Sequence, residues 1–295
     1  TALLILILAP EAYLPLRQLG LHYHASTEGL AAASRVFEIL DQSPPRRSEP
    51  DEDGGPPLPP ANSLPVVVDR LRIDYPRRPA PAVDGFCLRA EPGEMVVLTG
   101  PSGAGKSTVL SAILGFVEPT AGRVCLGEGA NAVDLGAADP DAWLAQLAYL
   151  PQRPYLFAGT VADNIRLGCP SADHAAILRA AGQACLDDLP DGLSTLVDEG
   201  GAGLSTGQRQ RVGLARVFLR DAGLVLLDEP TANLDRTTEQ EISQVIRSLA
   251  GTRTVIAVSH RPALVRLADR VVRLPAAPGR AGRTDSAAAQ PAVAA

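Results

Sequence analysis

The stretch Gly100-Pro-Ser-Gly-Ala-Gly-Lys-Ser-Thr108 decides the fold expected of this chain of 295 residues. Its glycines allow successive backbone N–H groups to converge on one anion, and the helix that follows would point its positive N-terminus at the same place. Lys106 is the only lysine in the chain, and a compact ammonium fits among phosphate oxygens where a planar guanidinium is too broad. The stretch therefore predicts a phosphate-binding loop of a nucleotide site, formed by Gly100, Pro101, Ser102, Gly103, Ala104, Gly105, Lys106, Ser107 and Thr108.

Apolar runs on both sides of this loop agree with that interpretation. Residues 95–99 predict a buried strand that leads into the loop, and residues 109–114 predict an apolar helix that leaves it. In such a loop Lys106 would reach the terminal phosphates, and the Ser107 hydroxyl would bind magnesium. The alternative is a glycine-rich turn that binds no ligand.

A second element lies far downstream, in Leu224-Val-Leu-Leu-Asp-Glu-Pro230. This is a short apolar strand that ends in two adjacent carboxylates. Ligands of α/β proteins bind at the carboxyl ends of parallel strands, so we expect Asp228 at that edge of the sheet. Asp228 suits magnesium there, and Glu229 suits a base that polarises water. Taken alone, the two acids could equally be the N-terminal cap of a helix.

A third element, Leu204-Ser-Thr-Gly-Gln-Arg-Gln-Arg211, precedes the helical run 212–219. A serine cap and a glycine at the start of a helix can form an anion site, and the alternative is an ordinary capped helix. Together the three elements resemble the ATP-binding cassette of ABC transporters. The resemblance covers residues 66–275 and rests on seven elements in the family's order.

This resemblance implies an α/β fold of the P-loop NTPase type, with a mixed sheet and a helical subdomain, and with ATP and Mg²⁺ as cofactors. The helical subdomain would carry the signature, which binds the ATP held by the partner subunit, through Leu204, Ser205, Thr206, Gly207 and Gln208. Thr206 stands where the family usually has glycine, and a β-branched residue there narrows the backbone's freedom to approach phosphate.

Four further residues take their roles from the resemblance. Tyr75 matches the aromatic residue that stacks on adenine, and Gln152 matches the glutamine that contacts magnesium. Asp235 matches the turn that crosses the dimer interface, and His260 matches the histidine at the γ-phosphate. Without their neighbours, Tyr75 would be interpreted as a core or turn residue, Gln152 as a surface residue and His260 as a structural residue. The implied catalytic residues are Glu229, His260 and Lys106, and the implied metal ligands are Ser107, Gln152 and Asp228.

Composition excludes some partners. A net charge of −6 and a sequence pI near 5.3 provide no basic face for nucleic acid, so we expect no DNA or RNA partner. Cys87, Cys125, Cys169 and Cys185 show neither the spacing of a zinc site nor the density of a disulfide scaffold. We interpret them as small apolar side chains of a reducing compartment.

The chain divides into four predicted parts. Residues 1–42 are expected to be the end of a last transmembrane helix and its cytoplasmic extension, because the apolar run within residues 1–8 is shorter than the about 20 residues that a bilayer needs. Residues 43–65 predict a disordered, proline-rich linker, and 66–275 the ABC nucleotide-binding domain. Residues 276–295 predict a disordered tail. The chain would then lie at a bacterial inner membrane, with residues from about 20 onward on the cytoplasmic side.

Two segments, 156–165 and 195–200, resemble those that exporters place against the membrane domain. Within the exporters, residues 9–40 most resemble the CydD-type half of the cysteine and glutathione exporters that serve cytochrome bd assembly. The resemblance thus implies a lipid bilayer, a small-molecule cargo and a second, homologous but non-identical subunit as partners. A lipid or drug exporter is the alternative, and an ABC-type ATPase acting on nucleic acid or ribosomes is an alternative from another class. A cassette that binds ATP without hydrolysing it also remains open.

Overall fold

The structure is a computed structural model that describes residues 58–76, 78–129 and 132–275, together with residues 19, 23, 26–37 and 40. The apolar opening of the chain, residues 43–57 of the predicted linker and the predicted tail at 276–295 lie outside the described residues. The chain forms two compact units, Thr1–Arg47 and Ser48–Ala295. In the first, residues 26–37 are helical, and Leu30 and Phe37 are exposed.

Within the described segments, no helix combines the length and the apolar character that crossing a bilayer requires.

A parallel sheet of five strands forms the centre of the second unit, in the order β11-β3-β10-β9-β6. The strands are β3 (Met95–Thr99), β6 (Leu147–Leu150), β9 (Leu224–Asp228), β10 (Thr254–Val258) and β11 (Arg270–Arg273). In the register, Val258 lies opposite both Leu98 and Asp228. The carboxyl ends of β3, β10 and β9 therefore meet at one edge of the sheet.

A separate antiparallel sheet has the order β2-β1-β4-β5. Its strands are β1 (Val66–Ile73), β2 (Val83–Ala90), β4 (Ala121–Leu126) and β5 (Val133–Asp134). The predicted α/β fold is confirmed, and the two strand directions are divided between two sheets. β9 and β10 are buried throughout, as parallel strands usually are, and β1 alternates between buried and less buried residues, as antiparallel strands often do. Which strands share a sheet, and in what order, depends on the tertiary fold.

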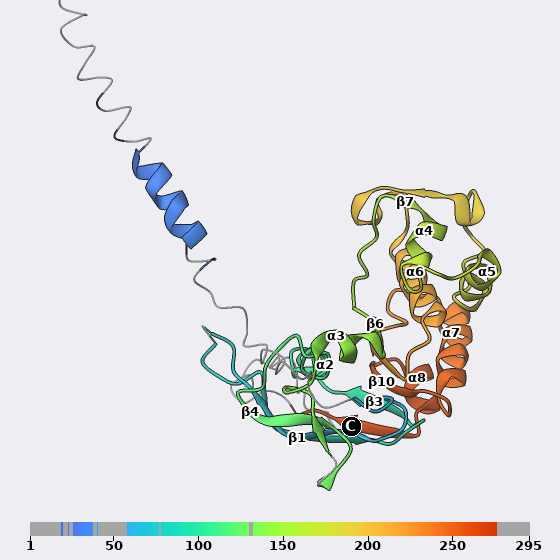
Figure 1. The fold of residues 1–295 in the computed structure, drawn as a ribbon. Coiled ribbons are helices and arrows are strands. Elements are labelled where there is room, and N and C mark those ends of the chain that lie inside the picture. The colour runs from blue at the N-terminus through green and yellow to red at the C-terminus, as the bar shows by residue number, and fades with distance from the viewer. Residues whose placement is uncertain are drawn as a thin grey trace, which may run out of the picture. The chain divides into compact units, whose positions relative to one another are not determined.

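Helices cover the parallel sheet and build a helical subdomain at one end of the unit. The covering helices are α2 (Lys106–Ile113), α3 (Pro140–Ala145), α7 (Arg236–Leu249) and α8 (Pro262–Leu267). The helical subdomain contains α4 (Val161–Arg166), α5 (His174–Gln183) and α6 (Thr206–Leu219), with the short strands β7 (Gly159–Thr160) and β8 (Leu196–Val197) and the 3₁₀ turns Gly192–Ser194 and Glu199–Gly201. Figure 1 shows β7, α4, α5 and α6 together at this end, apart from α2.

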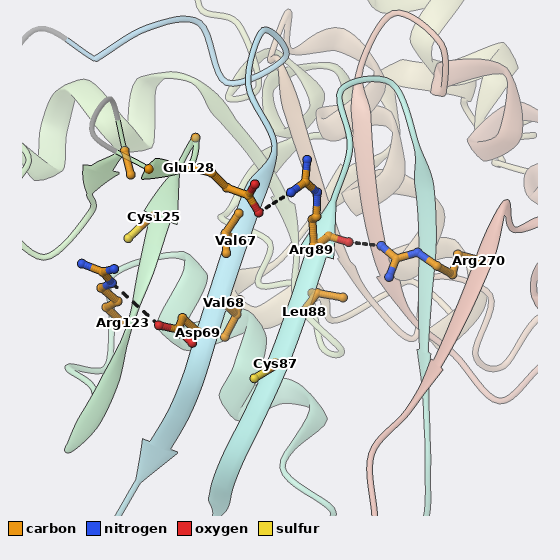
Figure 2. Close-up of a pocket in the computed structure, with 13 residues that line it drawn as sticks. Val67, Val68, Asp69, Cys87, Leu88, Arg89, Arg123, Cys125, Glu128 and Arg270 are labelled. Atoms are coloured by element: carbon orange, nitrogen blue, oxygen red, sulfur yellow. Dashed lines mark hydrogen bonds and ion pairs between the residues drawn. The ribbon is translucent and has the colours of Figure 1, made fainter.

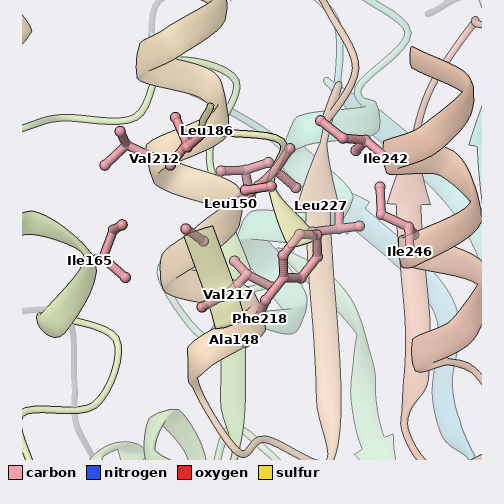
Figure 3. Close-up of a cluster of buried hydrophobic side chains, with 14 of the residues drawn as sticks. Ala148, Leu150, Ile165, Leu186, Val212, Val217, Phe218, Leu227, Ile242 and Ile246 are labelled. Atoms are coloured by element: carbon pink, nitrogen blue, oxygen red, sulfur yellow. The ribbon is translucent and has the colours of Figure 1, made fainter. Parts of the chain in front are cut away.

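Side chains of the parallel sheet are buried on both faces, as is usual for parallel sheets. Along β9, Val225 and Leu227 belong to the cluster under α6 and α7, whereas Leu224 and Leu226 belong to the cluster shared with α2 and the antiparallel sheet. Figure 3 shows the first cluster, where Phe218 of α6 packs near strand and α7 side chains. The continuous burial explains why these strands are uninterrupted apolar runs in the sequence.

The last residues of the predicted linker are packed against the sheet. Ala61 is buried, and its N–H donates to the side-chain oxygen of Gln146 at 2.6 Å. The Asn62 amide donates to the carbonyl of Thr252 at 3.0 Å. Gly223 approaches Asn62 so closely that a Cβ there would lie 2.9 Å from the Asn62 nitrogen. These residues contact the amino ends of β6, β9 and β10, which is the edge opposite the predicted site.

The interpretation of the cysteines as apolar filling holds for Cys125, which is buried, but is wrong for Cys87, which is exposed. Both line a groove of about 510 Å³ on the outer face of the antiparallel sheet, shown in Figure 2. Arg89 pairs there with Glu128, and Arg123 approaches Asp69 at 4.0 Å. Positive and negative groups offset one another in this groove, and it carries none of the residues of the predicted phosphate site.

A buried polar network joins α6 to the segment before α4. The Asn164 side chain accepts from Phe157 N–H at 2.9 Å and donates to the carbonyls of Phe157 and Thr160 at 2.9 and 3.0 Å. The Arg216 guanidinium donates to Asn164 Oδ1 at 2.7 Å and to the Tyr155 carbonyl at 2.6 Å. Burial lowers the pKa of Arg216 from its ordinary value. Oxygen acceptors thus hold a half-buried cation between α6 and the segment that carries Asn164.

We expect Asn164→Ala to lower the free energy of unfolding by about 2–4 kcal/mol, because it leaves buried donors and acceptors unpaired. Asn62→Ala is the matched control, since Asn62 makes one exposed hydrogen bond and should cost less than about 1 kcal/mol. Denaturant unfolding of both variants is the measurement. Equal losses in the two variants would contradict the role assigned to the network.

Candidate nucleotide-binding site

The loop at residues 100–105 joins β3 to α2 at the carboxyl edge of the parallel sheet. Gly100 and Gly105 have φ angles of 146° and 92°, a region open to glycine and costly for other residues. A Cβ at Gly105 would also lie 2.4 Å from the carbonyl oxygen of Ala82, at the start of β2. Glycine is therefore required at position 105 both by conformation and by space. The Lys106 ammonium donates to the carbonyls of Gly100 and Pro101, each at 2.9 Å, and so lies over the loop.

Asp228 ends β9 beside this loop. It is buried, and burial raises the pKa of its carboxyl above the ordinary value, while a hydrogen bond from Ser107 acts in the opposite direction. The burial of Tyr149, in β6, raises the pKa of its phenol, and the negative charge of Asp228 adds to this shift. Ser107 and Asp228 thus bring a hydroxyl and a carboxylate together, and these are oxygen donors of the type that magnesium prefers.

Glu229 follows Asp228 in a strained backbone conformation. Its φ of 51° is uncommon for a residue with a Cβ, and such outliers gather at functional sites. Its Oε1 lies 2.9 Å from Nδ1 of His260, which comes two residues after β10. Its Oε2 is buried and has no hydrogen-bond partner among the described residues. The second oxygen therefore keeps an unused hydrogen-bond acceptor site, and Glu229 does not cap a helix, since α7 is capped by Asp235.

Gln152 and Tyr75 lie on loops next to this edge. Gln152 is exposed and follows β6, whose Leu150 pairs with Leu227 of β9, one residue before Asp228. Tyr75 is half-buried in the loop between β1 and β2, and the start of β2 is the segment that touches Gly105. Tyr75 thus belongs to a segment that borders the phosphate loop, and Gln152 belongs to one that follows the strand next to β9, which ends in Asp228.

The residues at 204–208 lie elsewhere. Leu204 is buried, and Ser205 caps α6 reciprocally with Gln208: Gln208 N–H donates to Ser205 Oγ at 3.1 Å, and Ser205 N–H donates to Gln208 Oε1 at 2.9 Å. Thr206 begins the helix, and its hydroxyl accepts from Arg209 at 3.1 Å. Figure 1 shows α6 in the helical subdomain, apart from α2. The fold therefore does not join these residues to the phosphate loop of the same chain.

Asp235 is the N-terminal cap of α7. Its carboxylate accepts from the N–H groups of Thr237 and Thr238 at 3.0 and 3.1 Å, and from the Thr238 hydroxyl at 2.7 Å. The Thr238 hydroxyl is the largest cause of a lowered pKa at Asp235. The turn before it, at Asn233, lies against the start of α6, where a Cβ on Gly207 would be 3.4 Å from the Asn233 carbonyl. Sequence reasoning did not foresee this capping role.

Two neighbours of the site were also missed. Gln210 is buried in α6 and donates to the Glu229 carbonyl at 3.3 Å. Its spacing of four residues from Leu214 places it on the buried face of the helix, so helical periodicity could have identified it. Arg78 lies over Tyr75, with its guanidinium carbon 5.8 Å from the ring centroid, and no sequence pattern marks that contact.

Comparisons with known proteins identify the family. Residues 83–232 match the family model of the ABC transporter. An ATP-dependent lipid A-core flippase of Chromobacterium violaceum is 38% identical over 269 residues, covering 88% of this chain and 44% of the flippase. The glutathione/L-cysteine transport system ATP-binding/permease protein CydC of Bacillus subtilis is 37% identical over 271 residues, again covering 88% of this chain and 44% of CydC.

A solved structure shows the same fold. A bacterial Atm1-family ABC exporter with ATP bound superposes with a TM-score of 0.73 at 31% identity, over 90% of this chain and 46% of that chain. The chain therefore spans less than half the length of each relative described here. On the fold, the site and the family match, this chain belongs to the ABC transporter family.

Proposed function

We propose that the chain is the ATP-binding and ATP-hydrolysing part of an ABC exporter. The observation that carries this proposal is the convergence of Lys106, Ser107, Asp228, Glu229 and His260 at one edge of the parallel sheet, from three separate segments of the sequence. The loop concentrates N–H groups beside a cation, and two acids face it from the end of β9. Such a set of groups suits phosphoryl chemistry, in which positioning and charge stabilisation supply most of the rate. The lipid A-core flippase and the Atm1-family exporter support the direction of transport.

In this proposal each residue has a defined task. Lys106 would bind the β- and γ-phosphates in place of the loop carbonyls, and Ser107, Asp228 and Gln152 would hold Mg²⁺, which would neutralise phosphate charge. Glu229 Oε2 accepts the proton of the attacking water, and His260 keeps Glu229 oriented and contacts the γ-phosphate. Tyr75 stacks on the adenine.

The position of α6 supports a site shared between two subunits. Residues 204–208 are remote from the phosphate loop of their own chain, so we propose that they bind the ATP of a partner cassette. Asp235, at the turn beside Gly207, would cross the same interface. The two cassettes would close around ATP head to tail and separate after hydrolysis. Thr206 stands where the family usually has glycine, so its side chain would restrict the approach of this backbone to the partner's phosphate.

The surroundings of the cassette remain proposals. Residues 1–42 would end the last membrane helix and extend from it, 43–65 would link it to the cassette at 66–275, and 276–295 would form a tail. The protein would sit in a bacterial inner membrane with its cassette in the cytoplasm. Its partner would be a homologous but different half-transporter.

The proposed cargo is a small thiol, cysteine or glutathione. The likeness of residues 9–40 to CydD-type exporters and the CydC relative support this choice, while the lipid A-core flippase has nearly the same identity and keeps a lipid cargo as the rival. The cargo therefore requires a direct test.

We expect inverted membrane vesicles with the full-length protein and its partner to accumulate radiolabelled cysteine or glutathione when ATP is added. A non-hydrolysable ATP analogue and the Glu229→Gln variant are the controls, and neither should support uptake. ATP-dependent uptake of a labelled lipid A precursor, with thiols left outside, would overturn the thiol cargo and keep the exporter. If ATP drove neither transport nor hydrolysis, the proposed function itself would fail.

A further inference from the structure

The backbone of Glu229 is held on three sides. Its N–H donates to the carbonyl of Val258 in β10 at 2.9 Å, and its carbonyl accepts from Ala232 N–H at 3.1 Å. The third contact comes from α6, where Gln210 Nε2 donates to the same carbonyl at 3.3 Å. The first two contacts come from the sheet and from the local turn, so Gln210 is the link from the helical subdomain to this carbonyl.

This third contact is built into the interior. Gln210 is 1% exposed, on the face of α6 that also carries Leu214 and Val217. An amide in an apolar interior is unfavourable unless its hydrogen bonds are made, so the Glu229 carbonyl is the partner that makes this residue type tolerable there. A hydrophobic side chain of the same size would fill the space equally well. The distinctive contribution of the amide is therefore its hydrogen bond to the Glu229 carbonyl.

The conformation of Glu229 explains why a hydrogen bond to its carbonyl matters. A φ of 51° is disfavoured for a residue with a Cβ, and it persists only where the surroundings hold it. This conformation aims the side chain so that Oε1 meets His260 and Oε2 stays buried and unpartnered. A relaxation of the peptide after Glu229 would rotate the carboxylate away from both positions.

We propose that Gln210 is a positioning residue for Glu229: its amide holds the Glu229 carbonyl and thereby keeps the carboxylate aimed at the attacking water. This inference rests on the proposed ATPase function, because a misaimed carboxylate matters only where it accepts a proton. Gln210 is buried and contacts the backbone carbonyl of Glu229, not its carboxylate. Its effect should consequently appear in the chemical step and not in ATP binding.

The test compares Gln210→Met with Gln240→Met in the full-length transporter. Methionine matches glutamine in size and lacks the N–H donor, and Gln240 is an exposed glutamine of α7. We expect kcat for ATP hydrolysis to fall about 10- to 100-fold in Gln210→Met, because small misplacements of catalytic groups cost rate on this scale. KM for ATP should change less than about twofold, and Gln240→Met should match the wild type.

A second background separates positioning from a general structural role. In a Glu229→Gln protein, where the proton acceptor is already absent, adding Gln210→Met should leave the residual single-turnover rate unchanged, because the two changes act through one group. If Gln210→Met slowed that residual rate by the same factor as in the wild type, the residue would act on the fold and the proposal would fail. Gln210→Glu keeps the shape and places an acceptor against the carbonyl, so it should be at least as slow as Gln210→Met.

Melting temperatures of the assembled variants complete the experiment. A positioning role is supported if Gln210→Met lowers kcat, melts at the temperature of the wild type, and causes no further loss of rate in the Glu229→Gln background. Wild-type turnover in both Gln210 variants overturns it, while leaving the ATPase function in place. A wild-type protein that hydrolyses no ATP overturns the proposed function instead, so the two failures are distinguishable.

Discussion

Replacing Glu229 with glutamine is expected to lower kcat for ATP hydrolysis by about 100- to 10,000-fold, the range that general base catalysis contributes. The amide retains the size of the carboxylate and one hydrogen-bond acceptor, so it can still contact His260, now 2.9 Å from Glu229 Oε1. What it loses is the ability to take a proton from water at the position of Oε2. ATP should therefore bind with little change, and the paired cassettes should accumulate in a closed, ATP-bound form.

The measurement is steady-state ATPase activity beside equilibrium binding of labelled ATP, on the assembled transporter. Glu118→Gln is a suitable control, because Glu118 is exposed and lies outside the site. Turnover in Glu229→Gln equal to that of the control would show that another group accepts the proton. A loss of ATP binding in Glu229→Gln would show that the acid holds nucleotide or metal instead.

Replacing Lys106 with alanine is expected to lower ATPase activity by about 100- to 1,000-fold, as does removal of a donor to developing negative charge. The ammonium now donates to two loop carbonyls, at Gly100 and Pro101, and these contacts lie at a half-buried position and not in the apolar core. Its removal should therefore leave the fold intact. ATP affinity should fall together with turnover, in contrast to Glu229→Gln.

Two companion variants sharpen this second prediction. Lys106→Arg keeps the positive charge and should remain poorly active, because a planar guanidinium does not fit where a compact ammonium meets crowded oxygens. Arg179→Ala removes an exposed cation of α5 and should match the wild type. The measurements are ATP binding, ATPase turnover and melting temperature of Lys106→Ala, Lys106→Arg and Arg179→Ala. Full activity of Lys106→Arg would reduce the role of Lys106 to charge alone.

Local patterns in the sequence were sufficient for a large part of the fold. The apolar runs at 95–99 and 224–228 are β3 and β9 with the bounds that burial on both faces predicts. The glycines at 100 and 105 adopt the positive φ angles that the loop requires, and Ser205 caps α6. Each of these features depends on residues a few positions apart, where steric and capping preferences act directly. For this reason a single sequence reveals them.

The tertiary structure decided how distant groups meet. Glu229 adopts a φ of 51° although it is no glycine, because β10, the turn at Ala232 and Gln210 hold its backbone from three directions. The contact of Glu229 with His260 joins residues 31 positions apart, and it exists because β9 and β10 pair in parallel with Asp228 opposite Val258. Strand order and register arise from the packing of the whole core. A local pattern specifies which residues can carry chemistry, and only the packed sheet aims them at one point.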